Sequence, residues 1–152
     1  EAETGATLIH PFDDAQVIAG QATAALELIE AVPDLDIVIA PVGGGGLLAG
    51  IAAVVRRLRP NVRLIGVEPD DADAMARSLR EGRRVVLDQV GLFADGVAVR
   101  QVGAEPLRIC RELVDEIQAR CGVALPELLA RLAELELGEA VVRLPGALFV
   151  RG

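Results

Sequence analysis

The chain has 152 residues, of which 52% are hydrophobic, and its formal net charge is −8 at pH 7. This length fits one ordinary domain, or one domain with a small appendage, and the composition can supply a buried core. The acidic balance excludes the basic surface that attracts nucleic acids and anionic membranes, so we expect neither as a partner and favour a small molecule or a protein.

The N-terminal part of the sequence predicts an extended segment followed by one helix. Pro11 restricts His10 to extended geometry. Asp13 is a suitable N-cap, and Gln16 stands three positions later, as in a capping box. Apolar residues at helical spacing then continue the helix to about Ala31.

Residues 37–50, Ile-Val-Ile-Ala-Pro-Val-Gly-Gly-Gly-Gly-Leu-Leu-Ala-Gly, predict an anion site. The apolar run 37–39 is typical of a buried parallel strand, and Leu47 to Leu58 of the helix that follows it. Backbone without Cβ atoms can bring its N–H groups against a ligand, and the helix N-terminus adds partial positive charge. The residues that we predict to bind a phosphate are Gly43, Gly44, Gly45, Gly46 and Leu47.

Two other interpretations of the glycine run remain open. The first is a tight turn that only packs the helix on the strand, although one or two glycines would suffice for that. The second is a dinucleotide-binding domain, because Gly44, Gly46 and Ala49 fit the G-x-G-x-x-A pattern. Glu68 stands about 20 residues further on, at the end of the next strand, where a ribose-binding carboxylate belongs.

The middle of the chain continues the alternation of strands and helices. Residues 62–67 predict a second buried strand, and Asp71 to Glu81 a helix that ends at Gly82. Short apolar stretches between 85 and 99 favour loop and edge structure. A further helix begins at Ala104, with an apolar stripe at Leu107, Cys110, Leu113, Val114 and Ile117. We therefore expect an α/β fold over residues 1–118, a parallel sheet with flanking helices.

The tail, residues 121–152, has a different pattern. Pro126 to Leu137 predicts an amphipathic helix, and 141–144 and 147–151 predict two strands joined by a turn at Pro145-Gly146. A helix followed by such a hairpin is typical of the end of a winged helix, and residues 123–151 resemble the winged-helix tail of bacterial DNA-processing protein A. Three arginines against four glutamates do not favour DNA binding here.

Metal and nucleophile chemistry find little support in the sequence. His10 is the only histidine, and Cys110 and Cys121 lack the further Cys or His partners of a zinc site, so we predict no metal site. All 15 basic residues are arginine, which excludes a Schiff base formed by a lysine of this chain. The few cysteines, and the absence of a signal peptide or an apolar run of about 20 residues, predict a soluble cytoplasmic protein.

Five segments in one order resemble the biosynthetic threonine dehydratases (threonine ammonia-lyases), which are fold-type II pyridoxal-phosphate enzymes. The segments are His-Pro-Phe-Asp-Asp at 10–14, Ile-Ala-Gly-Gln-Ala-Thr at 18–23, Pro-Val and the four glycines at 41–46, Gly-Val-Glu-Pro at 66–69, and Val-Gly-Leu-Phe-Ala-Asp-Gly-Val-Ala-Val at 90–99. The resemblance covers residues 1–117. It implies that the glycines bind the cofactor phosphate and that residues 94–96 lie near the cofactor ring.

The resemblance also implies an activity that this chain would not perform alone. The family deaminates threonine to 2-oxobutanoate and ammonia in isoleucine biosynthesis, using a lysine from an N-terminal region that this chain lacks. The serine that binds the cofactor's pyridine nitrogen is missing from Pro-Gly-Ala-Leu at 145–148. We therefore expect a fragment that binds pyridoxal 5'-phosphate non-covalently at most, with no catalytic residue of its own. A catalytically empty chimera or designed scaffold remains the alternative, and a homo-oligomer is compatible with either.

Overall fold

The computed structural model describes residues 5–91, 94–119, 141–144 and 148–151. The chain divides into two units, residues 1–120 and residues 121–152. Within the described ranges, no helix is both long enough and apolar enough to cross a bilayer.

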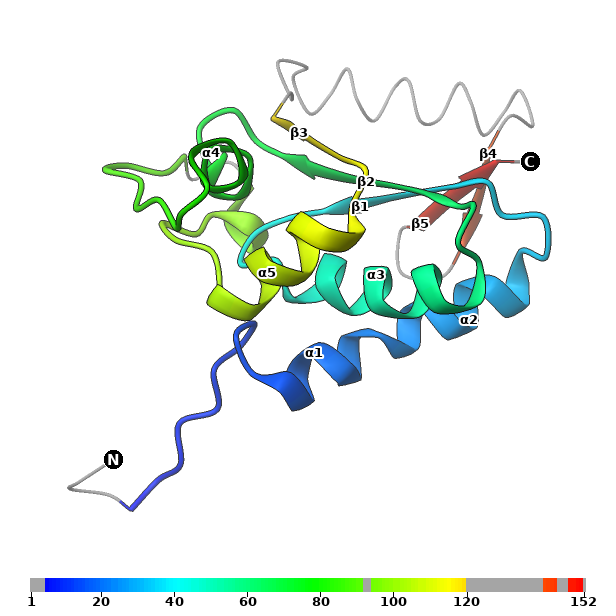
Figure 1. The fold of residues 1–152 in the computed structure, drawn as a ribbon, viewed down its shortest axis with the longest axis horizontal. Helices are drawn as coiled ribbons and strands as arrows, with labels where there is room; N and C mark the ends of the chain where they lie inside the picture. Colours follow the sequence, from blue (N-terminus) through cyan, green and yellow to red (C-terminus); the bar gives the residue numbers. More distant parts are fainter. Residues whose placement is uncertain (1–4, 92–93, 120–140, 145–147, 152) are drawn as a thin grey trace. The chain divides into compact units, whose positions relative to one another are not determined.

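Unit one is built on a three-stranded parallel sheet in the order β1-β2-β3 (Figure 1). The strands are β1 (Ile37–Pro41), β2 (Arg63–Glu68) and β3 (Glu116–Ala119). Ile65 in the central strand is paired with Ile39 on one side and with Glu116 on the other. The parallel α/β architecture predicted from the alternation of elements is thereby confirmed.

Helices cover one side of this sheet in two layers. The helices of unit one are α1 (Ala15–Gln21), α2 (Thr23–Ala31), α3 (Gly46–Leu58), α4 (Ala74–Glu81) and α5 (Ala104–Leu113), with a 3₁₀ turn, η1 (Asp95–Val97). Figure 1 shows α1, α2, α3 and α5 on the same side of the strands. Because α1 and α2 pack against α3, and α3 packs against α5 and β1, α3 is the central helix of the unit.

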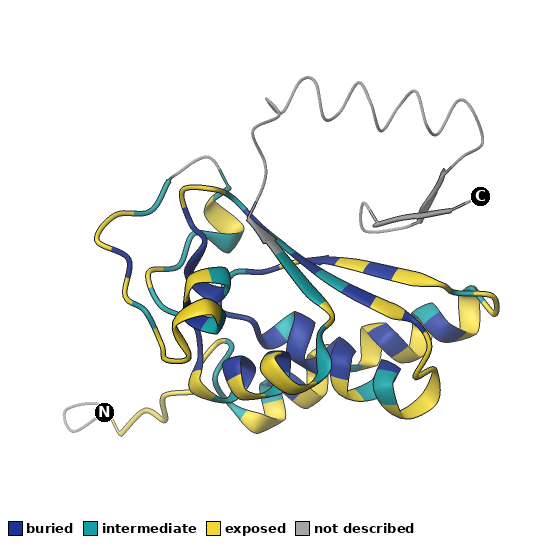
Figure 2. Ribbon diagram, turned by 45° about the horizontal axis from the view of Figure 1, so that its top comes forward, coloured by how far each residue is buried: buried dark blue, intermediate teal, exposed yellow. Residues whose placement is uncertain are grey.

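The first strand is buried on one face only. Val38 and Ala40 are 6% and 3% exposed, whereas Ile37 and Ile39 are 48% and 63% exposed. Successive side chains of a strand point to opposite faces, and the helices described here cover only one of them (Figure 2). The prediction that residues 37–39 are buried throughout is therefore wrong for Ile37 and Ile39.

The predicted N-terminal helix is two helices, and its cap is a different residue. Asp14, not Asp13, caps α1: its Oδ1 accepts the N–H groups of Gln16 at 2.8 Å and of Val17 at 3.1 Å. The capping box is wrong because Gln16 is only the second residue of the helix. The helix is interrupted at Ala22, where the backbone of α3 approaches so closely that a Cβ on Gly50 would lie 2.8 Å from the nitrogen of Ala22.

The helix predicted from Ala104 ends at Leu113, and Ile117 lies in β3, so the apolar stripe does not continue to Ile117 as predicted. Asp115 makes the connection between the two elements. Its Oδ2 accepts the N–H of Leu64 at 2.6 Å, and its carboxylate forms an ion pair with Arg56. These partners belong to β2 and α3, so contacts distant in sequence turn the chain into the sheet.

The helix predicted at 71–81 begins three residues later, at Ala74. Gly82 ends it in the left-handed conformation, with φ of 72°, as predicted. The described parts of 83–103 contain no strand, so the loop prediction for 85–99 is confirmed and the edge structure is not.

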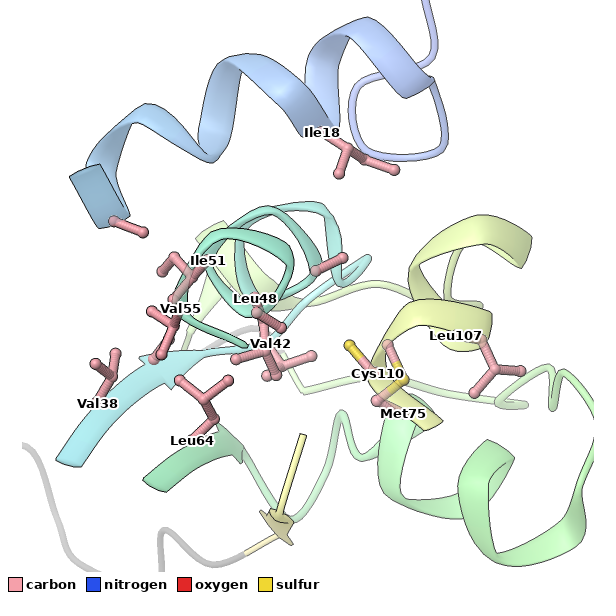
Figure 3. Packing of buried hydrophobic residues seen from close by; sticks show 14 of the residues in the cluster. Ile18, Val38, Val42, Leu48, Ile51, Val55, Leu64, Met75, Leu107 and Cys110 are labelled. Carbon is pink, nitrogen blue, oxygen red and sulfur yellow. The ribbon is translucent and has the colours of Figure 1, made fainter. Parts of the chain in front are cut away.

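The core of unit one lies between the sheet and α3 (Figure 3). Leu48 and Leu64 are fully buried there, and Met75 from α4 and Cys110 from α5 meet at one end. Burial is the main cause that raises the pKa of the Cys110 thiol to about 12, with the nearby charge of Glu68 adding to it. The predicted apolar environment of Cys110 is confirmed.

Unit two contains the predicted ribbon. β4 (Val141–Leu144) and β5 (Leu148–Arg151) pair antiparallel, with Val142 opposite Val150. The predicted helix at 126–137, the turn at 145–146 and Cys121 lie outside the described residues, so the winged-helix interpretation stays a prediction.

Candidate functional site

The glycine loop, residues 43–46, connects the carboxyl end of β1 to α3. Val42 donates its N–H to the carbonyl of Val67 at 2.9 Å, which continues the sheet pairing up to the loop. Gly45 is the N-cap of α3 and has φ of 94°, a left-handed conformation that favours glycine. Ligands of parallel α/β sheets bind beyond the carboxyl ends of the strands, and the loop lies there.

Two of the glycines lie directly against Phe12. A Cβ on Gly44 would lie 2.1 Å from Cγ of the Phe12 ring, and one on Gly46 would lie 3.0 Å from the Phe12 carbonyl oxygen. The ring therefore packs on the backbone of the loop, with no room for a side chain. Sequence reasoning did not single out Phe12, and the only signal for it was the conspicuous His-Pro-Phe-Asp-Asp segment.

The other two glycines also have close neighbours in the chain. A Cβ on Gly43 would lie 3.0 Å from the Cα of Val97, and one on Gly45 would lie 2.5 Å from Cε of Met75 and 2.9 Å from Cβ of Pro106. Intramolecular packing thus accounts for all four glycines. The expectation that a ligand is needed to explain their number is wrong, and a ligand must be argued from the N–H groups instead.

Those N–H groups have no acceptor in the described part of the chain. The amides of Gly43 to Leu47 donate no hydrogen bond to another described residue, and the first bond of the following turn runs from Ala49 N–H to the Gly45 carbonyl at 2.9 Å. The N-terminus of α3 has no side-chain cap and no acidic residue in its first turn. Consecutive donors and the positive end of a helix dipole together fit a phosphate group.

Three other helices of the unit have carboxylates at their N-termini. Asp14 caps α1, Asp13 accepts the N–H groups of Ala104 and Glu105 at the start of α5, and Glu68 accepts those at the start of α4. In contrast, the N-terminus of α3 is open, and α3 is the helix that the glycine loop begins.

Glu68 does not offer its carboxylate to a ribose. The side chain is fully buried, and it accepts the N–H groups of Met75 and Ala76, each at 2.8 Å. Burial raises its pKa to about 7, although the hydrogen bonds from Ala76 and Met75 partly oppose the shift. Since this carboxylate closes the N-terminus of α4, Glu68 does not fill the role of ribose ligand that the dinucleotide interpretation gives it.

The segment at 94–99 comes to the glycine loop from a distant part of the sequence. Residues 95–97 form η1, and the backbone of Val97 contacts Gly43. The resemblance implies that residues 94–96 lie near a cofactor ring, and the structure shows the next residue, Val97, in contact with the loop at Gly43. Among the described residues, no group of three or more His, Cys, Asp or Glu side chains is arranged to hold a metal ion.

Comparisons with known proteins show which family the chain resembles. The pyridoxal-phosphate dependent enzyme family matches residues 1–145. The chain is 58% identical over 116 residues to the chloroplastic biosynthetic threonine dehydratase of Arabidopsis thaliana. The aligned residues make up 76% of this chain and 20% of that protein. It is 44% identical over 153 residues to the mitochondrial threonine dehydratase of Schizosaccharomyces pombe, covering 99% of this chain and 25% of that protein.

A solved structure shows the same fold. The processed form of threonine deaminase isoform 2 from Solanum lycopersicum superimposes with a TM-score of 0.77 at 45% identity, over 79% of this chain and 35% of that one. The chain spans about a fifth to a quarter of the length of the curated relatives described above.

Proposed function

The chain belongs to the pyridoxal-phosphate dependent enzyme family, and we propose that it forms the phosphate-holding part of a lyase that acts on threonine. The observation that carries the proposal is that the amides of Gly43 to Leu47, at the uncapped N-terminus of α3, donate to no other residue that the structure describes. The similarity to threonine dehydratases supports threonine as the substrate.

Each residue of the loop has a distinct part in this proposal. Gly43, Gly44, Gly45 and Gly46 present their N–H groups to the phosphate of pyridoxal 5'-phosphate, and Leu47 presents the N–H of the first turn of α3. The partial positive charge at this helix end stabilises the dianion. When bound, the cofactor supplies the electron sink through which an amino acid loses its α-proton.

The proton-transfer groups of the reaction are not among these residues. No lysine occurs in the sequence, so the amine that attaches the cofactor and takes the α-proton has to come from outside these 152 residues. We propose that this chain binds the cofactor non-covalently through its phosphate and is inactive by itself. Because only the phosphate end is held, the affinity is expected in the millimolar range, about −4 kcal/mol.

A titration followed by amide chemical shifts tests the proposal. On addition of inorganic phosphate or pyridoxal 5'-phosphate, the shift changes should centre on Gly43 to Leu47. The variant Leu47→Asp should weaken binding, since it puts a negative charge in the first turn of α3, where it competes with the phosphate.

Leu47→Asn is the matched control, because it makes nearly the same change of size and polarity without the charge, and it should bind better than Leu47→Asp. Absence of any shift with either ligand would leave only the scaffold interpretation. Shifts that appear with a dinucleotide and with neither phosphate ligand would favour the dinucleotide interpretation instead.

A further inference from the structure

Three residues of the N-terminal segment, His10, Phe12 and Asp13, connect the glycine loop to its neighbours without belonging to it. We refer to them as the clamp residues. Each makes a contact that the proposed function does not use, and together the contacts link the loop to α5.

Phe12 holds the loop on one side. Its ring occupies the space where Gly44 would carry a side chain, and its backbone lies against Gly46, with its Cα 3.1 Å from the Cβ position there. Phe12 is only partly buried, and its ring packs on the loop backbone at Gly44. Phe12 thereby limits the conformations that Gly44 can adopt.

Asp13 connects the same segment to the start of α5. Its two carboxylate oxygens accept the N–H groups of Ala104 at 2.8 Å and of Glu105 at 2.9 Å. Gly103, the residue before the helix, donates its N–H to the carbonyl of Gly44 at 3.0 Å. The contacts therefore form a closed circuit that runs from Asp13 through α5 and Gly103 to Gly44, and back through Phe12.

His10 fixes the turn that orients the other two clamp residues. Its Nδ1 accepts the N–H of Asp13 at 3.0 Å and, at the longer distance of 3.4 Å, that of Phe12. The imidazole also contacts the Phe12 ring edge to face, with the centroids 4.5 Å apart. We predicted no catalytic or metal-binding role for this histidine, and its contacts stabilise the local conformation of residues 10–13.

We infer that the clamp residues position the amides of the glycine loop for an anion, so that residues outside the binding site set its affinity. The inference rests on the proposed function, since it concerns the same loop. Four successive glycines lose more conformational entropy than other residues when they are ordered, and parallel N–H dipoles repel one another. A loop held in place before binding avoids that loss when the ligand arrives.

A pair of neighbouring caps provides the test. Asp13→Ala removes the cap of α5 and breaks the circuit, whereas Asp14→Ala removes the cap of α1 and leaves the circuit intact. Both variants lose one negative charge and one helix cap. Binding is measured on the full 152-residue chain, from the amide shifts of Gly43 to Leu47 during titration with inorganic phosphate.

Positioning and simple electrostatics predict opposite results for Asp13→Ala. Loss of a negative charge close to the loop would by itself strengthen anion binding. Loss of the circuit should instead weaken it, by roughly fivefold or more, which is the lower end of typical coupling between two sites. Asp14→Ala should bind as the unmodified chain does. Asp13→Asn, which keeps an acceptor without the charge, should restore part of the affinity.

The outcomes separate the two proposals. If the unmodified chain binds no phosphate, the proposed function fails. If it binds phosphate and Asp13→Ala binds equally well or better, the proposed function stands and the positioning role is wrong. Thermal melts establish that each variant is folded, and if Asp13→Ala does not fold, Phe12→Leu replaces it. That variant removes the ring from Gly44 and should also weaken binding, and unchanged affinity would overturn the inference.

Discussion

Glu68, at the end of β2, accepts the N–H of Met75 on α4 at 2.8 Å while its side chain is fully buried. The carboxylate thus closes the N-terminus of a helix in surroundings that disfavour its charge. Since the burial raises its pKa from 4.5 to about 7, the stability of unit one should depend on pH in the range between those two values.

The sign of this dependence follows from the protons that each state binds. Between pH 4.5 and 7 the folded chain keeps the proton on Glu68, whereas the unfolded chain has lost it. The contribution of this proton to the stability of unit one is therefore complete below pH 4.5 and disappears as the pH rises through about 7. The free energy of unfolding should fall by up to about 3 kcal/mol over this range. Glu68→Gln should remove this slope in urea unfolding at several pH values. An identical slope in the variant would contradict the assignment.

Arg56→Met should lower the free energy of unfolding by about 2 to 3 kcal/mol, because buried carbonyls lose a charged donor. Arg56 donates to the carbonyls of Leu113 at 2.7 Å and Val62 at 2.6 Å, and its side chain is only 20% exposed. Arg57→Met, in the same last turn of α3, is the control, since Arg57 is exposed and its side chain makes no hydrogen bond to another described residue. Chemical denaturation of both variants measures the difference, and equal losses would refute the anchoring role.

Two left-handed glycines differ in the space around them and give a matched comparison. A Cβ on Gly82 meets nothing within 4 Å, so Gly82→Ala should cost only the left-handed backbone penalty of about 1 to 2 kcal/mol. Gly45→Ala should cost a further 1 to 3 kcal/mol, roughly, because its methyl would overlap Met75 and Pro106. Thermal melts of the two variants test the packing of the glycine loop. An equal loss of stability in both would show that the loop accommodates the methyl group of the Gly45→Ala variant without further destabilisation.

The 152-residue chain should produce no 2-oxobutanoate from threonine when pyridoxal 5'-phosphate is added. All 15 of its basic residues are arginine, and arginine neither attaches the cofactor nor serves as the base at neutral pH. A coupled assay for 2-oxobutanoate, compared with a control without protein, measures the activity. Formation of product by protein free of contaminating enzyme would mean that an amine other than a lysine side chain completes the site.

Local patterns predicted the parts of the fold that depend on neighbouring residues. The β-branched run, the glycines and the apolar helix at 37–58 were predicted almost at their observed limits, and Gly82 was predicted as the end of α4. The errors occur where distant contacts decide. Asp13 satisfies the local signs of an N-cap, yet it closes a helix 91 residues further on. Ile117 fits a helical stripe, yet Asp115 and its partners on α3 and β2 direct it into a strand.

In the candidate site, too, local features could be predicted from the sequence and contacts between distant residues could not. Its loop was predicted from the glycines alone, because a lack of side chains is visible in the sequence. Phe12 and Val97, which explain why no side chain fits there, come from 31 or more residues before and 54 residues after Gly43. No periodicity or local motif connects residues so far apart.

The circuit through Asp13, Gly103 and Gly44 also bears on the order in which the chain folds. Its hydrogen bonds join residues near position 13 to residues near position 104, and contacts of such sequence separation form slowly, because most of the chain has to be ordered first. The strand and helix on either side of the glycine loop can assemble from local contacts. We expect the loop to reach its final conformation only when the N-terminal segment and α5 are both in place, so the anion binding that we propose for it should be acquired at the end of folding.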